Sequence, residues 1–230
     1  TAGTLTLAGA QTFPNISGTL TLTSGTLADG GKTITVTGAI SNSATHSGAG
    51  VIIVNGATSI GGNNGTFGNL TIQTNSTVAT SGAQTITGTL RLENASTTLN
   101  IASFALSALG NIYSNASPGT AVAFTTTKRI LMSGFHNANG LTRQGAAGNL
   151  LFPVGSSAVG ANPTIPYTPI TINVAATTHG TKSVRPVNSE HPNVTTTNQS
   201  LVYYWRVTSS GYSGITTVTH SAYDYSTAAE

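Results

Sequence analysis

Residues 18–22, Gly-Thr-Leu-Thr-Leu, and 35–40, Thr-Val-Thr-Gly-Ala-Ile, recur 50 positions later as 68–72, Gly-Asn-Leu-Thr-Ile, and 85–90, Thr-Ile-Thr-Gly-Thr-Leu. Both matches share one offset and need no gap, so two short segments repeat in the same register. A looser copy, Gly-Asn-Ile at 110–112, lies 22 positions after its counterpart in the last segment. The repeating unit is therefore one coil of about 20 to 25 residues, which predicts a parallel β-helix, or β-solenoid, of about five coils.

Within each repeat, apolar and polar residues alternate as in a strand with one buried face. Leu20 and Leu22 would point into the solenoid, while Thr19, Thr21 and Thr23 would point outward. The same division recurs in Leu5 and Leu7, Ile34 and Val36, Leu70 and Ile72, and Leu90 and Leu92. We expect these aliphatic side chains to form a stacked interior column.

The composition also favours strands over helices. Only 6% of the 230 residues are charged, against roughly 25% in ordinary soluble domains, and 38% are hydrophobic. Surface helices need Glu, Lys and Arg, whereas Thr and Val suit strands and Gly and Asn suit turns. The chain is thus expected to be all-β.

The second half of the chain has a different texture, with denser aromatic residues and prolines. We predict a solenoid over residues 1–117 and a β-sandwich-like module over 118–230, whose final strand a neighbouring chain would supply. The strands expected in this module are 121–126, 129–133, 170–174, 183–186, 201–207 and 216–221.

Charge and cysteine content limit the partners. The formal net charge is +3, and Lys128-Arg129 is the one adjacent basic pair, so we expect no nucleic-acid partner. There is no cysteine. No apolar stretch reaches the roughly 18 residues of a membrane span, so the chain is not expected to span a membrane.

Catalytic and metal-binding patterns are weak. The acidic residues Asp29, Glu93, Glu190, Asp224 and Glu230 are not paired by the repeat, as a glycan-cleaving β-helix would require. The five histidines have no metal-ligand spacing, and His220 with Asp224 would merely share one face of a strand. We therefore expect a non-catalytic protein without metal or cofactor.

Threonines at alternate positions predict a candidate outward face. Its members are Thr19, Thr21, Thr35, Thr37, Thr71, Thr85 and Thr87. Outward Thr-x-Thr rows on a flat solenoid resemble those of ice-binding proteins. In the alignment of the repeat, Thr35 and Thr37 fall on Thr85 and Thr87, but Thr19 falls on Asn69, so the rows recur only in part.

One combination of motifs resembles a known group of proteins. These are 150–155, Leu-Leu-Phe-Pro-Val-Gly, then 167–172, Tyr-Thr-Pro-Ile-Thr-Ile, then His191, then 203–207, Tyr-Tyr-Trp-Arg-Val. They look like a module of Gly/Thr/Ser-rich, adhesin-like surface proteins of Bacteroidetes, which leave the cell by type IX secretion. The resemblance covers roughly residues 1–225 and implies a secreted, extracellular or cell-surface location.

The function favoured by these observations is structural or adhesive, in a surface fibre or a large adhesin. Residues 1–7 already read as part of a coil, so we expect head-to-tail or strand-mediated self-association. Two alternatives stay open, ice binding through the Thr rows and binding or cleavage of surface glycans. Aromatic candidates for glycan stacking are Tyr203, Tyr204, Trp205, Tyr212, Tyr223 and Tyr225.

Overall fold

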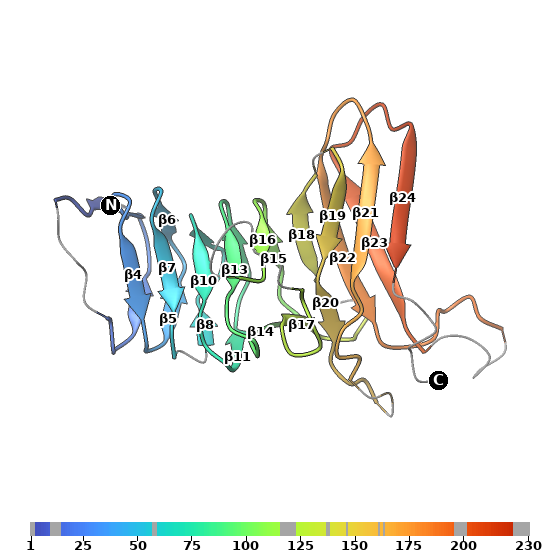
Figure 1. Ribbon diagram of the computed structural model, residues 1–230, viewed down its shortest axis with the longest axis horizontal. Coiled ribbons are helices and arrows are strands. Elements are labelled where there is room, and N and C mark those ends of the chain that lie inside the picture. Colours follow the sequence, from blue (N-terminus) through green and yellow to red (C-terminus); the bar gives the residue numbers. More distant parts are fainter. Residues whose placement is uncertain are drawn as a thin grey trace.

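Three parallel sheets wrap the chain into a β-solenoid, which continues at its C-terminal end into antiparallel strands (Figure 1). The computed structural model describes residues 3–9, 15–56, 59–115, 123–136, 139–145, 147–160, 162, 164–195 and 202–222. These residues form strands, turns and loops and no helix, so the expected all-β class is confirmed.

Between Thr26 and Met132, each turn of the solenoid visits a nine-stranded, a five-stranded and a seven-stranded sheet in that order. The nine-stranded sheet contains β1 (Thr4–Thr6), β3 (Thr26–Ala28), β6 (Thr45–Ser47), β9 (Gly65–Phe67), β12 (Gln84–Ile86), β15 (Leu106–Ala108), β18 (Leu141–Gln144), β22 (Thr181–Val187) and β23 (Tyr204–Ser210). The five-stranded sheet contains β4 (Thr33–Val36), β7 (Val51–Val54), β10 (Leu70–Ile72), β13 (Leu90–Leu92) and β16 (Ile112–Tyr113). The seven-stranded sheet contains β2 (Leu20–Leu22), β5 (Ile40–Asn42), β8 (Ser59–Gly61), β11 (Thr77–Thr80), β14 (Thr98–Ala102), β17 (Arg129–Met132) and β20 (Val154–Ser156).

The solenoid has about seven turns, so the expected count of five was too low. The parallel pairing continues beyond residue 117, where β17 pairs with β14, β18 with β15 and β20 with β17. These late turns are longer, because Ser107 lies much farther along the chain from its next partner, Thr142, than from its previous partner, Thr85. The lengthened turns lack the repeat spacing that marked the earlier coils.

The interior is the expected column of stacked aliphatic side chains. In the five-stranded sheet Val36, Val54, Ile72 and Leu92 are register partners from strand to strand, and all four are fully buried. Complete burial of one such side chain contributes roughly 1.5 to 3 kcal/mol. Stacking between neighbouring coils therefore contributes to the apolar stabilisation of the fold.

At the C-terminal end, two antiparallel layers form the sandwich-like part of the fold. One layer is β18–β22–β23, and the other is a three-stranded sheet of β19 (Asn149–Phe152), β21 (Ile170–Ala175) and β24 (Thr217–Ala222). Ile170, Ile172 and Val174 of one layer and Val184 of the other belong to one core, against which Trp205 packs.

The expected boundary near residue 117 lies outside the described residues, and the nine- and seven-stranded sheets continue across that region. Of the strands expected beyond it, those at 129–133, 170–174, 183–186, 201–207 and 216–221 correspond to β17, β21, β22, β23 and β24. Residues 123–126 are not a strand, and β18, β19 and β20 were not foreseen.

Candidate functional site

A continuous row of hydroxyl side chains crosses the whole nine-stranded sheet. Each residue in the row is the register partner of the next, and every one is Thr or Ser. In spatial order the row consists of Thr4, Thr26, Thr45, Thr66, Thr85, Ser107, Thr142, Ser183 and Thr208.

Strand alternation holds this row on the outside of the solenoid. Thr66 lies between buried Gly65 and Phe67, and Thr85 lies between buried Gln84 and Ile86. Because neighbouring side chains in a strand point to opposite faces, the hydroxyl residues point away from the core. The row therefore presents one hydroxyl per strand, at the strand spacing of about 4.7 to 4.9 Å.

The outward rows of the other two sheets are mixed. On the five-stranded sheet, Thr35, Ile53, Thr71, Arg91 and Tyr113 are successive register partners. On the seven-stranded sheet, a comparable row contains Ala79, Asn100, Leu131 and Gly155. The uniform row on the nine-stranded sheet is thus a property of that face and not of the solenoid as a whole.

The structure distributes the seven threonines of the expected face over all three sheets. Thr85 belongs to the hydroxyl row, and Thr87 follows the same strand, β12. Thr35 and Thr71 lie on the five-stranded sheet, where Thr71 is buried, and Thr37 follows β4. Thr21 lies in β2 of the seven-stranded sheet, directly after Thr19 and Leu20.

The offset of the sequence repeat explains this scatter. It aligned β2 with β10 and β4 with β12, which belong to different sheets. One turn of the solenoid is the distance along the chain between register partners such as Ile34 and Ile52, or Thr4 and Thr26. This distance is longer than a third of the 50-residue offset and shorter than half of it. The offset is therefore not a whole number of turns, and sequence similarity at that distance compared strands on different faces.

An ionisable pair that the sequence did not reveal lies inside the solenoid. Asp29 and His46 are both essentially inaccessible to solvent, with the Asp29 Oδ2 atom 2.9 Å from His46 Nε2. The Asp29 Oδ1 atom accepts hydrogen bonds from the backbone N–H groups of Gly31 and Gly50, at 2.7 and 3.0 Å. Asp29 and His46, which are 17 positions apart in the sequence, meet because the neighbouring strands β3 and β6 are paired.

Hydrogen bonding fixes the protonation of this pair. The backbone N–H of Gly68 donates to His46 Nδ1 at 3.2 Å, so the ring proton is on Nε2 and is donated to the Asp29 carboxylate. Burial lowers the pKa of His46, and the attraction of Asp29 offsets part of that effect. The pair resembles the orienting half of a catalytic triad, but its seclusion in the core makes it a polar cross-link between coils.

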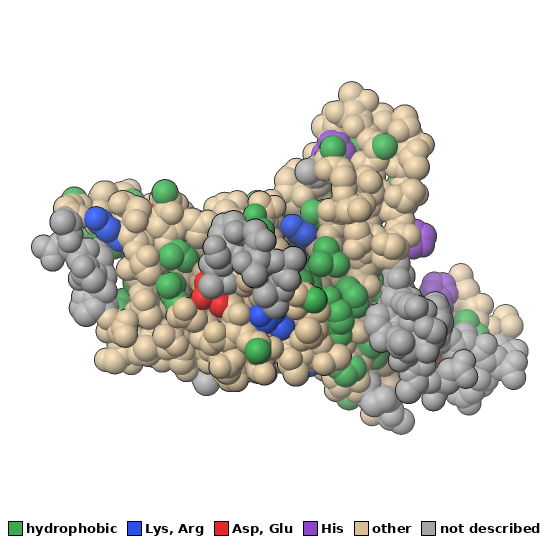
Figure 2. Space-filling view, viewed as in Figure 1, with side chains coloured by type: hydrophobic (Ala, Val, Ile, Leu, Met, Phe, Trp, Pro, Cys, Tyr) green, Lys and Arg blue, Asp and Glu red, His purple; other side chains and the backbone are tan. Residues whose placement is uncertain are grey.

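Charged side chains on and beside the five-stranded sheet have polar or aromatic partners. Gln73 Nε2 donates to Glu93 Oε2 at 2.9 Å, and Lys128 Nζ donates to the backbone oxygens of Glu93 and Ser114. The guanidinium of Arg91 lies over the ring of Tyr113, 4.7 Å from its centroid. Charged side chains are otherwise sparse on the face shown in Figure 2.

Within the described ranges, no three His, Asp or Glu side chains come close enough together to hold a metal ion. The same ranges contain no helix with the length and hydrophobicity needed to cross a membrane. Asp224, Glu230, Tyr223 and Tyr225 lie outside the described residues.

The aromatic candidates of the second half divide between core and surface. Tyr203 is buried and makes an edge-on contact with Trp205, whose Nε1 donates to the backbone oxygen of Thr168 at 3.0 Å. Tyr204 points to the outer face of the nine-stranded sheet, where its hydroxyl is 2.7 Å from His136 Nδ1.

Comparison with known proteins gives no match, whether to a family model, to a characterised protein or to a solved structure.

Proposed function

We propose that the chain is a non-catalytic, extracellular structural or adhesive module of a bacterial cell surface, and that the hydroxyl row is its contact face. The observation that carries this proposal is the row itself, unbroken over nine strands while the other faces are mixed. A rigid, uncharged surface of regularly spaced hydroxyls can donate and accept hydrogen bonds repeatedly. Such a face suits a partner that is itself repetitive, such as a polysaccharide or another copy of the chain.

Self-association is supported by the edges of the nine-stranded sheet. Among the described residues, β1 pairs only with β3, and β23 pairs only with β22. Because β18 is parallel to β15 and β22 and β23 then each reverse direction, β23 runs the same way as β1. One copy's β23 could therefore pair in parallel with β1 of the next, and the hydroxyl row would continue from Thr208 to Thr4.

Electron microscopy of the purified chain, with its mass measured in solution, tests the assembly. Leu5 of β1 is 64% exposed, and Leu5→Lys would place a charge at the proposed contact. We expect filaments of the unaltered chain, their loss in Leu5→Lys and their persistence in the control Thr77→Lys, on an exposed mid-solenoid position. Monomers of the unaltered chain at every concentration would refute head-to-tail assembly.

Adhesion through the hydroxyl row is tested separately. Thr66→Lys and Thr85→Lys each insert a long charged side chain into the middle of the row, while Thr77→Lys places one on the seven-stranded sheet. Binding to glycan-coated or cell-coated surfaces should fall for the first two variants and be unchanged for the third. Equal binding by all three would show that the row is not the contact face.

Ice binding is the second candidate, and it is favoured by the constant interval between hydroxyls along the row. A second outward row lies two positions further along each strand of the same sheet, and it is less regular. It contains Ala28, the register partner of Thr6, and Leu109, two positions after Ser107, in place of hydroxyl residues. Thermal hysteresis of the unaltered chain that disappears in Thr66→Lys and persists in Thr77→Lys would establish this function. Freezing behaviour identical to that of an inert protein would exclude it.

A further inference from the structure

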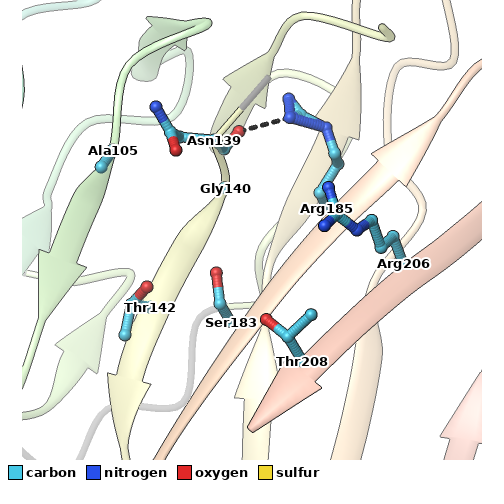
Figure 3. Close-up of a pocket in the computed structure, with 8 residues that line it drawn as sticks. All are labelled: Ala105, Asn139, Gly140, Thr142, Ser183, Arg185, Arg206 and Thr208. Carbon is cyan, nitrogen blue, oxygen red and sulfur yellow. Dashed lines mark hydrogen bonds between the residues drawn. The ribbon is translucent and has the colours of Figure 1, made fainter. Parts of the chain in front are cut away.

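A hollow of about 150 Å³ lies on the outer face of the nine-stranded sheet, where the hydroxyl row reaches its C-terminal end (Figure 3). Two arginines line it, Arg185 from β22 and Arg206 from β23. The other lining residues are Ala105, Asn139, Gly140, Thr142, Ser183 and Thr208. Three members of the hydroxyl row thus form one wall, and two guanidinium groups form another.

The two arginines are directly opposite each other in the antiparallel β22–β23 pair. Like charges in such positions repel, because the β-carbons of opposed residues are about 4.5 to 5.5 Å apart. Among the described residues, neither arginine forms an ion pair with a carboxylate, since the single ion pair there is that of Asp29 and His46. The fold therefore carries two adjacent positive charges with no described counter-charge.

The two guanidinium groups differ in burial and in the number of their backbone contacts. Arg185 is only 3% exposed, and it donates to the backbone oxygens of Asn139 at 2.6 Å and Ser133 at 3.2 Å. Its Nε atom is buried and has no hydrogen-bond partner. Arg206 is exposed and donates to the backbone oxygen of His136 at 3.2 Å. One guanidinium is thus a fixed part of the wall, and the other is free to contact a ligand.

Electrostatics and neighbouring aromatic rings agree with this geometry. Burial and the nearby charge of Arg206 lower the pKa of Arg185 to about 10, which still leaves the Arg185 guanidinium positively charged at neutral pH. Tyr204, two positions from Arg206 on the same face of β23, makes an edge-on contact with His191. Phe135, which precedes His136, is 61% exposed. Aromatic rings near the hollow offer a flat apolar surface against which a sugar ring can pack.

We propose that this hollow binds the acidic group of a glycan, a carboxylate or a sulfate, with neighbouring sugar hydroxyls meeting Thr142, Ser183 and Thr208. The inference rests on the proposed role of the hydroxyl row as a contact face, and it names the chemistry of the partner at one end of that face. The planar guanidinium of Arg206 supplies paired N–H donors that match the oxygens of either anion. The anion would then supply the counter-charge that these two arginines lack among the described residues.

A glycan fits this hollow better than a nucleic acid does. A nucleic acid requires cations spaced along a track of phosphates, and the two arginines are grouped at one point. The remaining wall is made of hydroxyls and one amide, which pair naturally with sugar hydroxyls that both donate and accept hydrogen bonds. Binding of single-stranded DNA is accordingly an outcome that the test must distinguish.

The experiment measures affinity of the full chain for four polymers: polygalacturonate for carboxylate, dextran sulfate for sulfate, uncharged dextran, and single-stranded DNA. Arg206→Gln removes one charge from the hollow, and Lys32→Gln removes one charge from a position outside it. Because Arg206 is exposed, its substitution should leave the fold intact, which circular dichroism would verify.

We expect Arg206→Gln to weaken binding of an acidic glycan about 10- to 100-fold, the loss of one charge-assisted hydrogen-bonding group, while Lys32→Gln leaves it unchanged. The tighter of the two acidic polymers identifies carboxylate or sulfate as the natural group. Absence of acidic-glycan binding, equal binding of dextran, or equal weakening by both substitutions would overturn the inference. Tighter binding of DNA that depends on Arg206 would replace it with a nucleic-acid site. Loss of surface adhesion in Thr66→Lys is independent of all these outcomes, so the proposed contact face can stand if the anion site fails.

Discussion

Replacing Asp29 by Ala should destabilise the solenoid more than any substitution on its surface. The carboxylate is fully buried and accepts three hydrogen bonds, from Gly31, Gly50 and His46. Its removal leaves the N–H of Gly50 and the Nε2–H of His46 without an acceptor inside the core. The Gly31 residue is exposed, so its N–H can turn to water instead.

The magnitude follows from the two donors that stay buried. Each unpaired buried donor costs about 1 to 3 kcal/mol, and breaking a buried ionisable pair by removing one partner costs about 3 to 5 kcal/mol. Since a domain is stable by about 5 to 15 kcal/mol, the variant should lose a large part of its stability. Asp29→Asn is the matched control, because it retains Oδ1 as acceptor for the two backbone donors.

Asp29→Asn should still cost about 1 to 3 kcal/mol. Its side-chain N–H₂ would face His46 Nε2, and the ring could accept from it only by moving its proton to Nδ1. That nitrogen already accepts from Gly68, so one of the two hydrogen bonds must be lost. The expected order of stability is therefore the unaltered chain, then Asn, then Ala.

Urea denaturation followed by circular dichroism measures the global loss, and amide hydrogen exchange measures the local one. The Gly50 and Gly68 amides donate directly into the pair, so in Asp29→Ala they should exchange about 100-fold faster or more, as a loss of about 3 kcal/mol requires. A destabilisation below about 1 kcal/mol, with these two amides still protected, would refute the assignment of the pair as a cross-link.

Three further predictions concern stability and are all measured by urea denaturation. Lowering the pH below 6.5, the pKa of an unperturbed histidine, should destabilise the chain, because the His46 ring binds a proton in the unfolded state but not when it is buried. The free energy of unfolding should fall by up to about 1.4 kcal/mol per pH unit until the pH reaches the lowered pKa of the folded state. This contribution to the pH dependence should vanish in His46→Gln. Ile52→Ala should cost about 2 to 5 kcal/mol, since Ile52 is fully buried between neighbouring coils, and an effect near zero would contradict the stacked core. Gly62→Ala should cost more than Gly31→Ala, because both glycines have positive φ but only at Gly62 would a β-carbon overlap the backbone of Asn42; equal costs would contradict that close approach.

The sequence predicted the solenoid because strand periodicity is a local property. Alternation in 18–22 and 85–90 needs only neighbouring residues, and the buried column of Val36, Val54 and Ile72 confirms the inward assignment. Turn length is less local: the late turns carry insertions, such as the long segment between Ser107 and its partner Thr142, that hide the period. The solenoid therefore extends past the expected end at residue 117, through β17, β18 and β20.

The candidate site required information that the sequence does not contain in an obvious form. Members of the hydroxyl row are separated by unequal intervals along the chain, since the step from Thr45 to Thr66 is longer than the step from Thr26 to Thr45. A search at one fixed offset therefore finds Thr85 but misses its neighbours in space. A better signal would have been a Thr or Ser flanked by two core residues in the same strand of every turn. The arginine hollow depends on the reversal at β22 and β23, which no repeat could indicate.

The difference between the three faces bears directly on whether the threonines are merely good strand formers. Threonine is favoured in strands because its branched side chain suits a pleated surface, and that preference is the same on every face of the solenoid. Strand propensity alone would therefore give similar outward rows on all three sheets. Instead the five-stranded sheet carries Ile53 and Arg91 in its outward row, whereas the nine-stranded sheet keeps Thr or Ser at all nine positions. The row even persists through β22 and β23, where the strands turn antiparallel and the solenoid repeat no longer dictates the register. This difference between the faces supports the proposal that the nine-stranded sheet carries a contact face.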